Sequence, residues 1–513
     1  MNIRTRFAPS PTGPLHMGGV RTALYAYLFA CKHQGTFILR IEDTDQTRYV
    51  PGAEEYIVQA LQWAGIKIHE GVSVGGPHAP YRQSERAEIY KKYAMQLIES
   101  GHAYYAFDTV EQLDQGRKAA EQKKQTFMYG AATRMSMNNS LTLSQAQVDA
   151  KLQAAESYVI RLKVPDQGQI EFNDLIRGSL SVACNTIDDK VLLKSDGMPT
   201  YHLAHMVDDV LMEITHVIRG EEWLPSAPAH VLLYRFLGLE KNMPAFAHLP
   251  LLLKPDGNGK LSKRDGDRLG FPVFPLNWVD PSSGETSSGY REKGYSPQAF
   301  VNMLAFLGWN PGTEKEIFTM QELIDSFSFD HVHKSGARFD PDKCRWFNAQ
   351  WLQQENDKDI ANRLRDDFIQ TYGLTQTDHK LSDAFLCKLI ALVKPRVEFE
   401  QEIIQAAPYL FSAPQSFDQN VMEKKWNENK RPFFIALSRQ WKDVSGVSAT
   451  EAESQFKQCA ADHQLKAGEV LQLLRVFISG QASGIDLFPM IELLSAKESS
   501  ERIAFALTQL AEK

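Results

Sequence analysis

The first 41 residues place a turn rich in glycine and proline between a strand and a helix. Residues 3–7 form the expected strand, and residues 8–14 contain three prolines and Gly13, which break regular structure. Gly35 ends the expected helix, and residues 37–41 form the next strand. The helix begins near Leu15, with apolar residues at helical spacing: Val20, Leu24, Tyr27, Leu28 and Cys31. This order predicts an α/β fold with a parallel sheet.

A helix that starts after such a turn is suited to an anion. Its first N–H groups lack partners within the helix, and the helix dipole is positive there. Gly18 and Gly19 would let a nucleotide lie directly on the backbone, and His16 could donate to a phosphate oxygen. Closely packed glycines and a histidine bonded within the fold would explain the same residues, so both interpretations stay open at this point.

A second informative segment, residues 254–267, contains three glycines, one proline and four cationic side chains. This composition predicts a loop. Most charged runs are solvated surface, which is one interpretation. The other is a flap whose ammonium groups close over ATP, because fixed cations stabilise the charge that develops during phosphoryl transfer. Lys260 and Lys263 are the candidate cations, and Ser262 is a hydroxyl donor.

Together the two segments resemble the ATP-binding signatures of class I aminoacyl-tRNA synthetases. His16–Gly19 is similar to the "HIGH" motif, with glycine in fourth place, and residues 260–264 are similar to "KMSKS". Other stretches resemble the glutamyl-tRNA synthetase family in particular: residues 40–45, 49–55, 75–86, 200–204, 208–209, 217–223, 307–311 and 334–340. The likeness is strong over residues 1–350 and weak beyond.

The resemblance implies a two-step reaction. The α-carboxylate of glutamate attacks the α-phosphorus of ATP, and a hydroxyl of the terminal adenosine of tRNA-Glu then takes the glutamyl group. It implies ATP and Mg²⁺ as the nucleotide substrate and its ion. The implied catalytic residues are His16, Lys260 and Lys263, and the implied ATP-binding residues are His16, Gly18, Gly19, Lys260, Ser262 and Lys263.

The resemblance also implies a glutamate pocket. Glu42 would accept from the substrate ammonium group, and Arg6 and Arg219 would bind its carboxylates bidentately. Salt bridges to Glu42, Glu221 or Glu222 are the structural alternative for the two arginines. His205 stands where relatives often carry asparagine or another small polar residue. The implied glutamate-binding residues are Arg6, Ala8, Ser10, Glu42, Tyr201, His205 and Arg219.

The expected fold is a Rossmann-type catalytic domain that is split by an insertion, followed by an all-α part. Residues 1–107 and 200–320 form the expected catalytic domain, and residues 108–199 the inserted domain that holds the tRNA acceptor end. By resemblance, residues 321–380 form a helical stem-contact region and residues 381–513 an all-α anticodon-binding domain. The glycine content supports the last division, since only six of 32 glycines lie in residues 331–513. Residues 271–288 are extra relative to the family pattern.

The composition bears on where the protein is located and on whether it holds a metal. No apolar run approaches the roughly 18 residues of a membrane helix, and the strand and motif at the start predict no signal peptide. Five scattered cysteines favour reduced thiols, and hence a cytoplasmic protein. Some relatives hold zinc in the region that matches residues 101–130. That region has no cysteine here, so we expect neither zinc nor another resident metal. We expect a monomer.

Three alternatives stay open. Glutaminyl-tRNA synthetase is the sister enzyme, but its anticodon region is normally a β-barrel. A truncated paralogue that glutamylates a modified tRNA base lacks the anticodon part, whereas more than 180 residues follow position 330 here. A degenerate tRNA-binding relative would be free to lose His16, Glu42, Lys260 and Lys263. Whether tRNA-Gln is also charged is not determined by these motifs.

Overall fold

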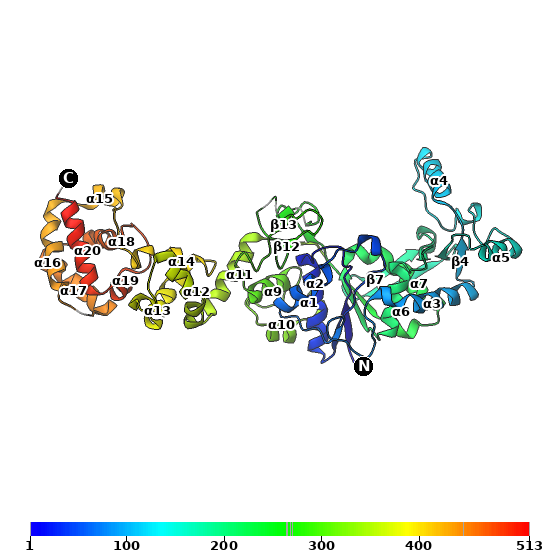
Figure 1. Ribbon diagram of the computed structural model, residues 1–513, viewed down its shortest axis with the longest axis horizontal. Helices are drawn as coiled ribbons and strands as arrows, with labels where there is room; N and C mark the ends of the chain where they lie inside the picture. The colour runs from blue at the N-terminus through cyan, green and yellow to red at the C-terminus, as the bar shows by residue number, and fades with distance from the viewer. Residues whose placement is uncertain (1, 263–264, 267, 269, 445, 512–513) are drawn as a thin grey trace. The chain divides into compact units, whose positions relative to one another are not determined.

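The computed structural model describes residues 2–262, 265–266, 268, 270–444 and 446–511. The chain divides into two compact units, one up to Cys344 and one from Arg345 (Figure 1). No described helix is both long and apolar enough to cross a membrane.

A seven-stranded sheet forms the centre of the first unit (Figure 1). Neighbouring strands are parallel except for β6 and β7, which form an antiparallel hairpin. In spatial order the strands are β3 (Glu70–Gly71), β2 (Thr36–Leu39), β1 (Arg4–Phe7), β9 (His216–Gly220), β10 (Ala245–Leu249), β6 (Gln169–Asp174) and β7 (Gly178–Ala183). The expected α/β fold with a parallel sheet is confirmed. Strands β6 and β7 come from residues 108–199, so part of that range belongs to the main sheet.

The first strand–helix–strand unit forms where the sequence predicts it. Helix α1 (Met17–Lys32) follows β1 and precedes β2 along the chain, and its side chains Val20, Leu24 and Leu28 are buried. Gly35 is required by space, because a Cβ atom there would lie 2.1 Å from the carbonyl oxygen of Ile3. The other helices of this unit, apart from those described next, are α2 (Ala53–Trp63), α3 (Ala87–Glu99), α6 (Tyr201–Leu211), α7 (Ala227–Phe236), α9 (Pro297–Phe306) and α10 (Met320–Ser326).

A separate three-stranded antiparallel sheet holds much of the remaining chain between residues 103 and 193. Its strands are β4 (Ala103–Ala106), β5 (Val159–Leu162) and β8 (Val191–Leu193), and the helices between them are α4 (Val110–Gln122) and α5 (Gln145–Gln153). Tyr104 and Tyr129 form a small core there with Ala106. Helix α4 buries no residue, as its polar sequence predicts.

Residues 271–290 pack against the start of α1. They include an antiparallel hairpin of β12 (Trp278–Val279) and β13 (Thr286–Ser287). The carbonyl of Val273 accepts from the backbone N–H of Met17 at 2.9 Å. Nearby, β11 (Leu252–Leu253) pairs in parallel with β14 (Ala337–Arg338).

The second unit is all-α, as expected: its described residues form helices joined by turns and loops, and no strand. Its core includes Phe385, Leu386, Leu389, Ile390 and Val393, which recur at helical spacing. Helix α11 (Pro341–Gln354) includes the boundary between the units. It is followed by α12 (Asp357–Tyr372), α13 (Asp383–Val393), α14 (Glu402–Ala406), α15 (Gln419–Lys425), α16 (Arg431–Trp441), α17 (Ala449–Asp462), α18 (Ala467–Ser479), α19 (Leu487–Leu494) and α20 (Ala496–Gln509).

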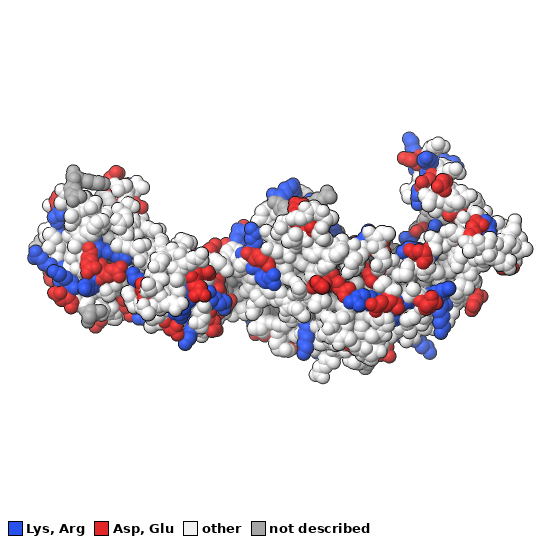
Figure 2. Space-filling model, viewed as in Figure 1, with Lys and Arg blue, Asp and Glu red and all other residues white. Residues whose placement is uncertain are grey.

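Charged side chains of both signs are interspersed on the face shown in Figure 2. The net charge is −7. Net charge alone therefore does not identify a surface for a polyanion.

Candidate active site

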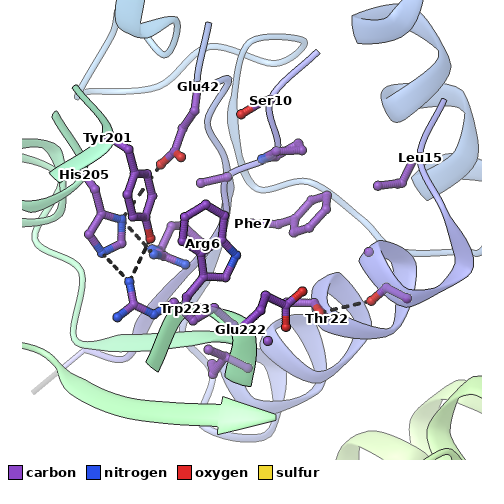
Figure 3. A pocket seen from close by; sticks show the side chains of 17 residues that line it. Arg6, Phe7, Ser10, Leu15, Thr22, Glu42, Tyr201, His205, Glu222 and Trp223 are labelled. Atoms are coloured by element: carbon purple, nitrogen blue, oxygen red, sulfur yellow. Dashed lines mark hydrogen bonds and ion pairs between the residues drawn. The ribbon is translucent and has the colours of Figure 1, made fainter. Parts of the chain in front are cut away.

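A cavity of about 270 Å³ opens where β1 and β9 end. Ligands of open α/β sheets bind at these carboxyl ends. Figure 3 shows Glu42, Tyr201 and His205 on one side of it and Leu15, just before α1, and Thr22, in α1, on the other. Nine residues predicted from the sequence line this cavity: Arg6, Ala8, Ser10, Gly18, Gly19, Glu42, Tyr201, His205 and Arg219.

The start of α1 differs from the expectation in one respect. We predicted unpaired N–H groups, but those of Met17, Gly18 and Gly19 each have a partner. His16 is the N-cap, and its Nδ1 accepts from Gly18 N at 3.1 Å. Because Nδ1 accepts, a neutral His16 carries its proton on Nε2, the tautomer that can donate to an anion. The helix dipole still makes this end favourable for negative charge.

The lysine segment begins as a hairpin. Leu253 and Lys260 form an antiparallel bridge, and Lys260 Nζ lies 2.9 Å from Glu222 Oε1 at the rim of the cavity. The Ser262 hydroxyl donates to Asp265, at 2.5 Å from its Oδ2. Lys263, the other predicted catalytic lysine, lies outside the described residues.

The two arginines of the cavity have different partners. Arg6 Nε lies 3.2 Å from Asp209 Oδ1. Arg219 donates from Nε to His248 Nε2 at 2.9 Å and from Nη1 to the Tyr201 hydroxyl at 2.8 Å. Its Nη2 is buried without a hydrogen-bond partner, and no ion pair found among the described residues joins it to a carboxylate. The salt-bridge alternative is therefore not realised for Arg219, which keeps one donor available.

Glu42 is buried beside a fixed cation. Arg40 is fully buried. Its Nη2 lies 3.2 Å from Glu42 Oε1, and its Nη1 lies 2.8 Å from Asp209 Oδ1. Burial raises the pKa of Glu42, and Arg40 and Arg6 oppose that rise. A substrate ammonium group would add a further cation, so binding of an amine and ionisation of Glu42 reinforce each other.

His205 lies between the two arginines. Its Nδ1 is 3.2 Å from Arg6 Nη2, and its Nε2 is 3.3 Å from Asp209 Oδ2. Burial, with Arg6 and Arg219 nearby, lowers its pKa well below the ordinary value, so the ring is neutral. A neutral ring has one donor and one acceptor. Arg6 can only donate, so Nδ1 is the acceptor in that contact, and Nε2 is also 3.4 Å from Arg219 Nη1.

Sequence reasoning did not assign several residues of the cavity. Trp223 is 42% exposed and lies 4.4 Å from the Tyr201 ring, centroid to centroid. Trp223 ends a family-like stretch of the sequence, residues 217–223, but a tryptophan at that position did not by itself indicate a role in the site. Thr22 and Leu15 follow from the helix start, because Thr22 lies in the second turn of α1 and Leu15 directly precedes its N-cap, His16.

A second cavity of about 300 Å³ adjoins the first and shares four lining residues with it. These are Ser10, Glu42, Tyr201 and Trp223. Its other lining residues include Arg48, Tyr49 and Lys194. The two cavities thus form neighbouring compartments with cationic side chains in both.

Two family models match the chain. Residues 2–346 match "tRNA synthetases class I (E and Q), catalytic domain", and residues 359–507 match "Anticodon binding domain". The parallel sheet, and the cavity between its strand ends and α1, thus define the catalytic domain of a class I tRNA synthetase.

Individual relatives narrow the assignment. A glutamate–tRNA ligase of Cytophaga hutchinsonii is 52% identical, covering 100% of this chain and 98% of the relative. One of Parabacteroides distasonis is 50% identical, covering 98% of both chains. The crystal structure of a glutamate tRNA ligase from Elizabethkingia meningosepticum, in complex with its amino acid, superposes with a TM-score of 0.92 at 47% identity, covering 99% of this chain and 100% of that one. The chain belongs to the glutamate–tRNA ligase family.

Proposed function

We propose that the protein attaches L-glutamate to tRNA-Glu, consuming ATP and releasing AMP and pyrophosphate. Glutamate first becomes glutamyl-adenylate, and the terminal adenosine of the tRNA then displaces AMP. The observation that carries the proposal is the arrangement of Glu42, Arg6 and Arg219 around one cavity at the start of α1. It offers one anion and two cations to a substrate with one ammonium group and two carboxylates.

The amino acid would bind by charge complementarity. Glu42 accepts from the ammonium group, and Arg219 donates to a carboxylate from Nη2, the nitrogen that has no hydrogen-bond partner among the described residues. Arg6 serves the other carboxylate, with His205, Ser10, Ala8 and Tyr201 shaping the pocket. A glutamine amide would leave a buried guanidinium without its charge partner, which is how a site built for a hydrogen bond rejects an analogue.

ATP, which arrives with Mg²⁺, would lie along the start of α1. His16 and the backbone at Gly18 and Gly19 contact the nucleotide, and Lys260, Ser262 and Lys263 hold its phosphates. The protein then acts by aligning the carboxylate with the α-phosphorus and stabilising the charge that develops. The step needs no covalent bond to the enzyme.

The adjoining cavity would receive the end of the tRNA. It shares Glu42 and Tyr201 with the amino-acid pocket, so a ribose hydroxyl there would approach the adenylate. The part of residues 108–199 outside the main sheet would hold the acceptor end, residues 321–380 would contact the stem, and residues 381–513 would read the anticodon. We propose a cytoplasmic monomer that holds no resident zinc or other metal.

The helical second unit also separates this proposal from its nearest rival. Glutaminyl enzymes are expected to carry a β-barrel there, and the described residues from 345 on form no strand. The two relatives reported above are named glutamate–tRNA ligases, and this chain matches 98% of the length of each.

The function is tested by incubating the purified chain with labelled glutamate, ATP, Mg²⁺ and either tRNA-Glu or tRNA-Gln. Label on tRNA-Glu is the expected result, and label on both tRNAs would define a non-discriminating enzyme. Failure to label either tRNA, with tRNA binding retained, would favour a degenerate tRNA-binding protein.

The buried Glu42 makes glutamate binding dependent on pH. Its pKa is raised, so Glu42 is protonated at a higher pH than an ordinary carboxyl group and then cannot pair with an ammonium group. We expect the KM for glutamate to rise as pH falls through that pKa, and to be constant above it. Glu42→Gln should raise the KM and remove this pH dependence. A KM profile that is the same in both proteins would contradict the assignment.

The pair of Lys260 and Glu222 gives opposite predictions for its two members. Lys260→Ala removes a phosphate-binding cation, and we expect kcat/KM for ATP to fall by about tenfold or more. Glu222→Gln removes the carboxylate that competes with the phosphates for Lys260, so the KM for ATP should fall. Steady-state charging with varied ATP measures both. A normal kcat/KM in the lysine variant would show that this lysine does not contact ATP.

A further inference from the structure

A buried chain of hydrogen bonds lies behind Arg219, on the side away from the substrate contacts proposed above. His248 belongs to β10, whose register pairs it directly with Arg219 on β9. Asp174 is the last residue of β6, the next strand of the sheet. Asp174 Oδ2 lies 2.6 Å from His248 Nδ1, and Arg219 Nε donates to His248 Nε2 at 2.9 Å. His248 and Asp174 are buried, and neither lines the cavity.

The surroundings of Asp174 determine which way the histidine proton points. The carboxylate also accepts from the backbone N–H groups of Ile176, Arg177 and His248. Burial alone would raise the pKa of Asp174, but the bond with His248 and the backbone donors lower it overall, so the group is ionised. An ionised carboxylate can only accept. His248 Nδ1 must therefore be the donor.

The state of His248 follows from that bond. Burial lowers the pKa of His248, and the partial opposition from Asp174 does not reverse this, so the ring is neutral. A neutral ring with its proton on Nδ1 has a lone pair on Nε2. That lone pair accepts from Arg219 Nε and fixes one edge of the guanidinium, while the Tyr201 hydroxyl accepts from Nη1 at 2.8 Å. Nη2 is the nitrogen left without a hydrogen-bond partner in the part of the chain that the structure describes.

We propose that Asp174 and His248 are positioning residues for the amino-acid substrate, which hold the Arg219 guanidinium in the orientation that presents Nη2 to a substrate carboxylate. This inference rests on the proposed role of Arg219. A planar guanidinium recognises a carboxylate by its orientation as well as its charge. Without the acceptor at Nε2, Arg219 keeps its charge but loses the bond that sets its plane.

Two substitutions of His248 separate the two halves of the chain. Asparagine places an amide near the Nδ1 position, so His248→Asn can keep the bond to Asp174 but cannot reach Arg219. Glutamine reaches the Nε2 position, so His248→Gln can still accept from Arg219. We expect His248→Asn to raise the KM for glutamate by about 10- to 100-fold, the size of a lost hydrogen bond to a charged group. His248→Gln should raise it by less than about fivefold, with the KM for ATP unchanged in both.

Asp174→Asn is a third variant that acts through the tautomer. The amide nitrogen can donate to Nδ1, which would move the ring proton of His248 to Nε2. Two N–H donors, those of His248 Nε2 and Arg219 Nε, would then face each other, and their hydrogen bond would be lost. We expect a rise in the KM for glutamate similar to that of His248→Asn. We also expect the double variant, Asp174→Asn with His248→Asn, to have a KM for glutamate no higher than that of either single variant, because both changes break the same chain of hydrogen bonds.

The assay is charging of tRNA-Glu by the full chain, with glutamate and ATP varied in turn. Wild-type charging tests the proposed function, whereas the ratios of variant to wild type test this inference. His216→Asn, a histidine at the start of β9, is the control and should behave as wild type. Equal effects of asparagine and glutamine at position 248, or equal rises in both KM values, would overturn the proposal. If Asp174→Asn fails to fold, the comparison of His248→Asn with His248→Gln still tests whether His248 positions Arg219.

Discussion

Arg219→Leu will lower kcat/KM for glutamate by about 10²- to 10³-fold. Truncating one partner of a buried, hydrogen-bonded charge pair typically costs about 2–5 kcal/mol, and each 1.4 kcal/mol is about tenfold. The protein should stay folded, because Arg219 forms no ion pair with a carboxylate among the described residues and its loss leaves no buried anion unpaired. Steady-state charging with saturating ATP and tRNA, and glutamate varied, measures the effect.

Arg219→Lys is the matched variant for this experiment. It keeps the charge but lacks the planar fork, so we expect a loss between wild type and leucine. The KM for ATP and the affinity for tRNA should be unchanged in both proteins. A leucine variant that charges glutamate within about threefold of wild type would show that Arg219 does not contact the substrate, since even a single charged hydrogen bond contributes more.

The second large effect is expected in stability. Asp209→Ala should destabilise the first unit by about 3–5 kcal/mol, the usual result of removing one partner from a buried ion pair. Asp209 is fully buried and is the nearest carboxylate to Arg40, at 2.8 Å, and it also contacts Arg6. Its removal leaves two buried guanidinium groups short of a partner. Thermal unfolding followed by circular dichroism measures the loss.

Two controls make that result interpretable. Asp209→Asn keeps an oxygen acceptor and should cost less than alanine. Asp114→Ala removes an exposed partner of Arg117, and pairs at the surface contribute little, so its melting temperature should equal that of wild type. If Asp209→Ala melts with wild type, the buried network does not support the fold in the way described.

The N-terminal elements could be predicted from the sequence for a physical reason. The apolar period of residues 20–31 and the break at residues 8–14 define α1, because helix periodicity and turn composition are local properties. Residues 6, 42, 201 and 219 were grouped through motif resemblance. Arg6, Glu42 and Arg219 meet because the ends of neighbouring parallel strands share one edge of the sheet, and Tyr201 joins them from the start of α6.

Other features depend on pairings that no local pattern encodes. The alternation in residues 169–174 is typical of a strand, but it does not tell which sheet the strand joins, and β6 joins the main one. The Asp174–His248 contact follows from that placement. In the same way, the carbonyl of Val273 reaches Met17 from a distant part of the chain and pairs its N–H group, whereas those of Gly18 and Gly19 are paired locally by His16.

The central claim is that the pocket selects glutamate by its charge. The most direct test compares kcat/KM for glutamate and glutamine in charging tRNA-Glu with the purified wild-type chain. We predict a preference for glutamate of about 10⁴-fold or more, because a buried guanidinium left without its charge partner rejects the amide. A preference below about tenfold, the discrimination that a single methylene can provide, would contradict the assignment of Arg6 and Arg219 to the substrate carboxylates.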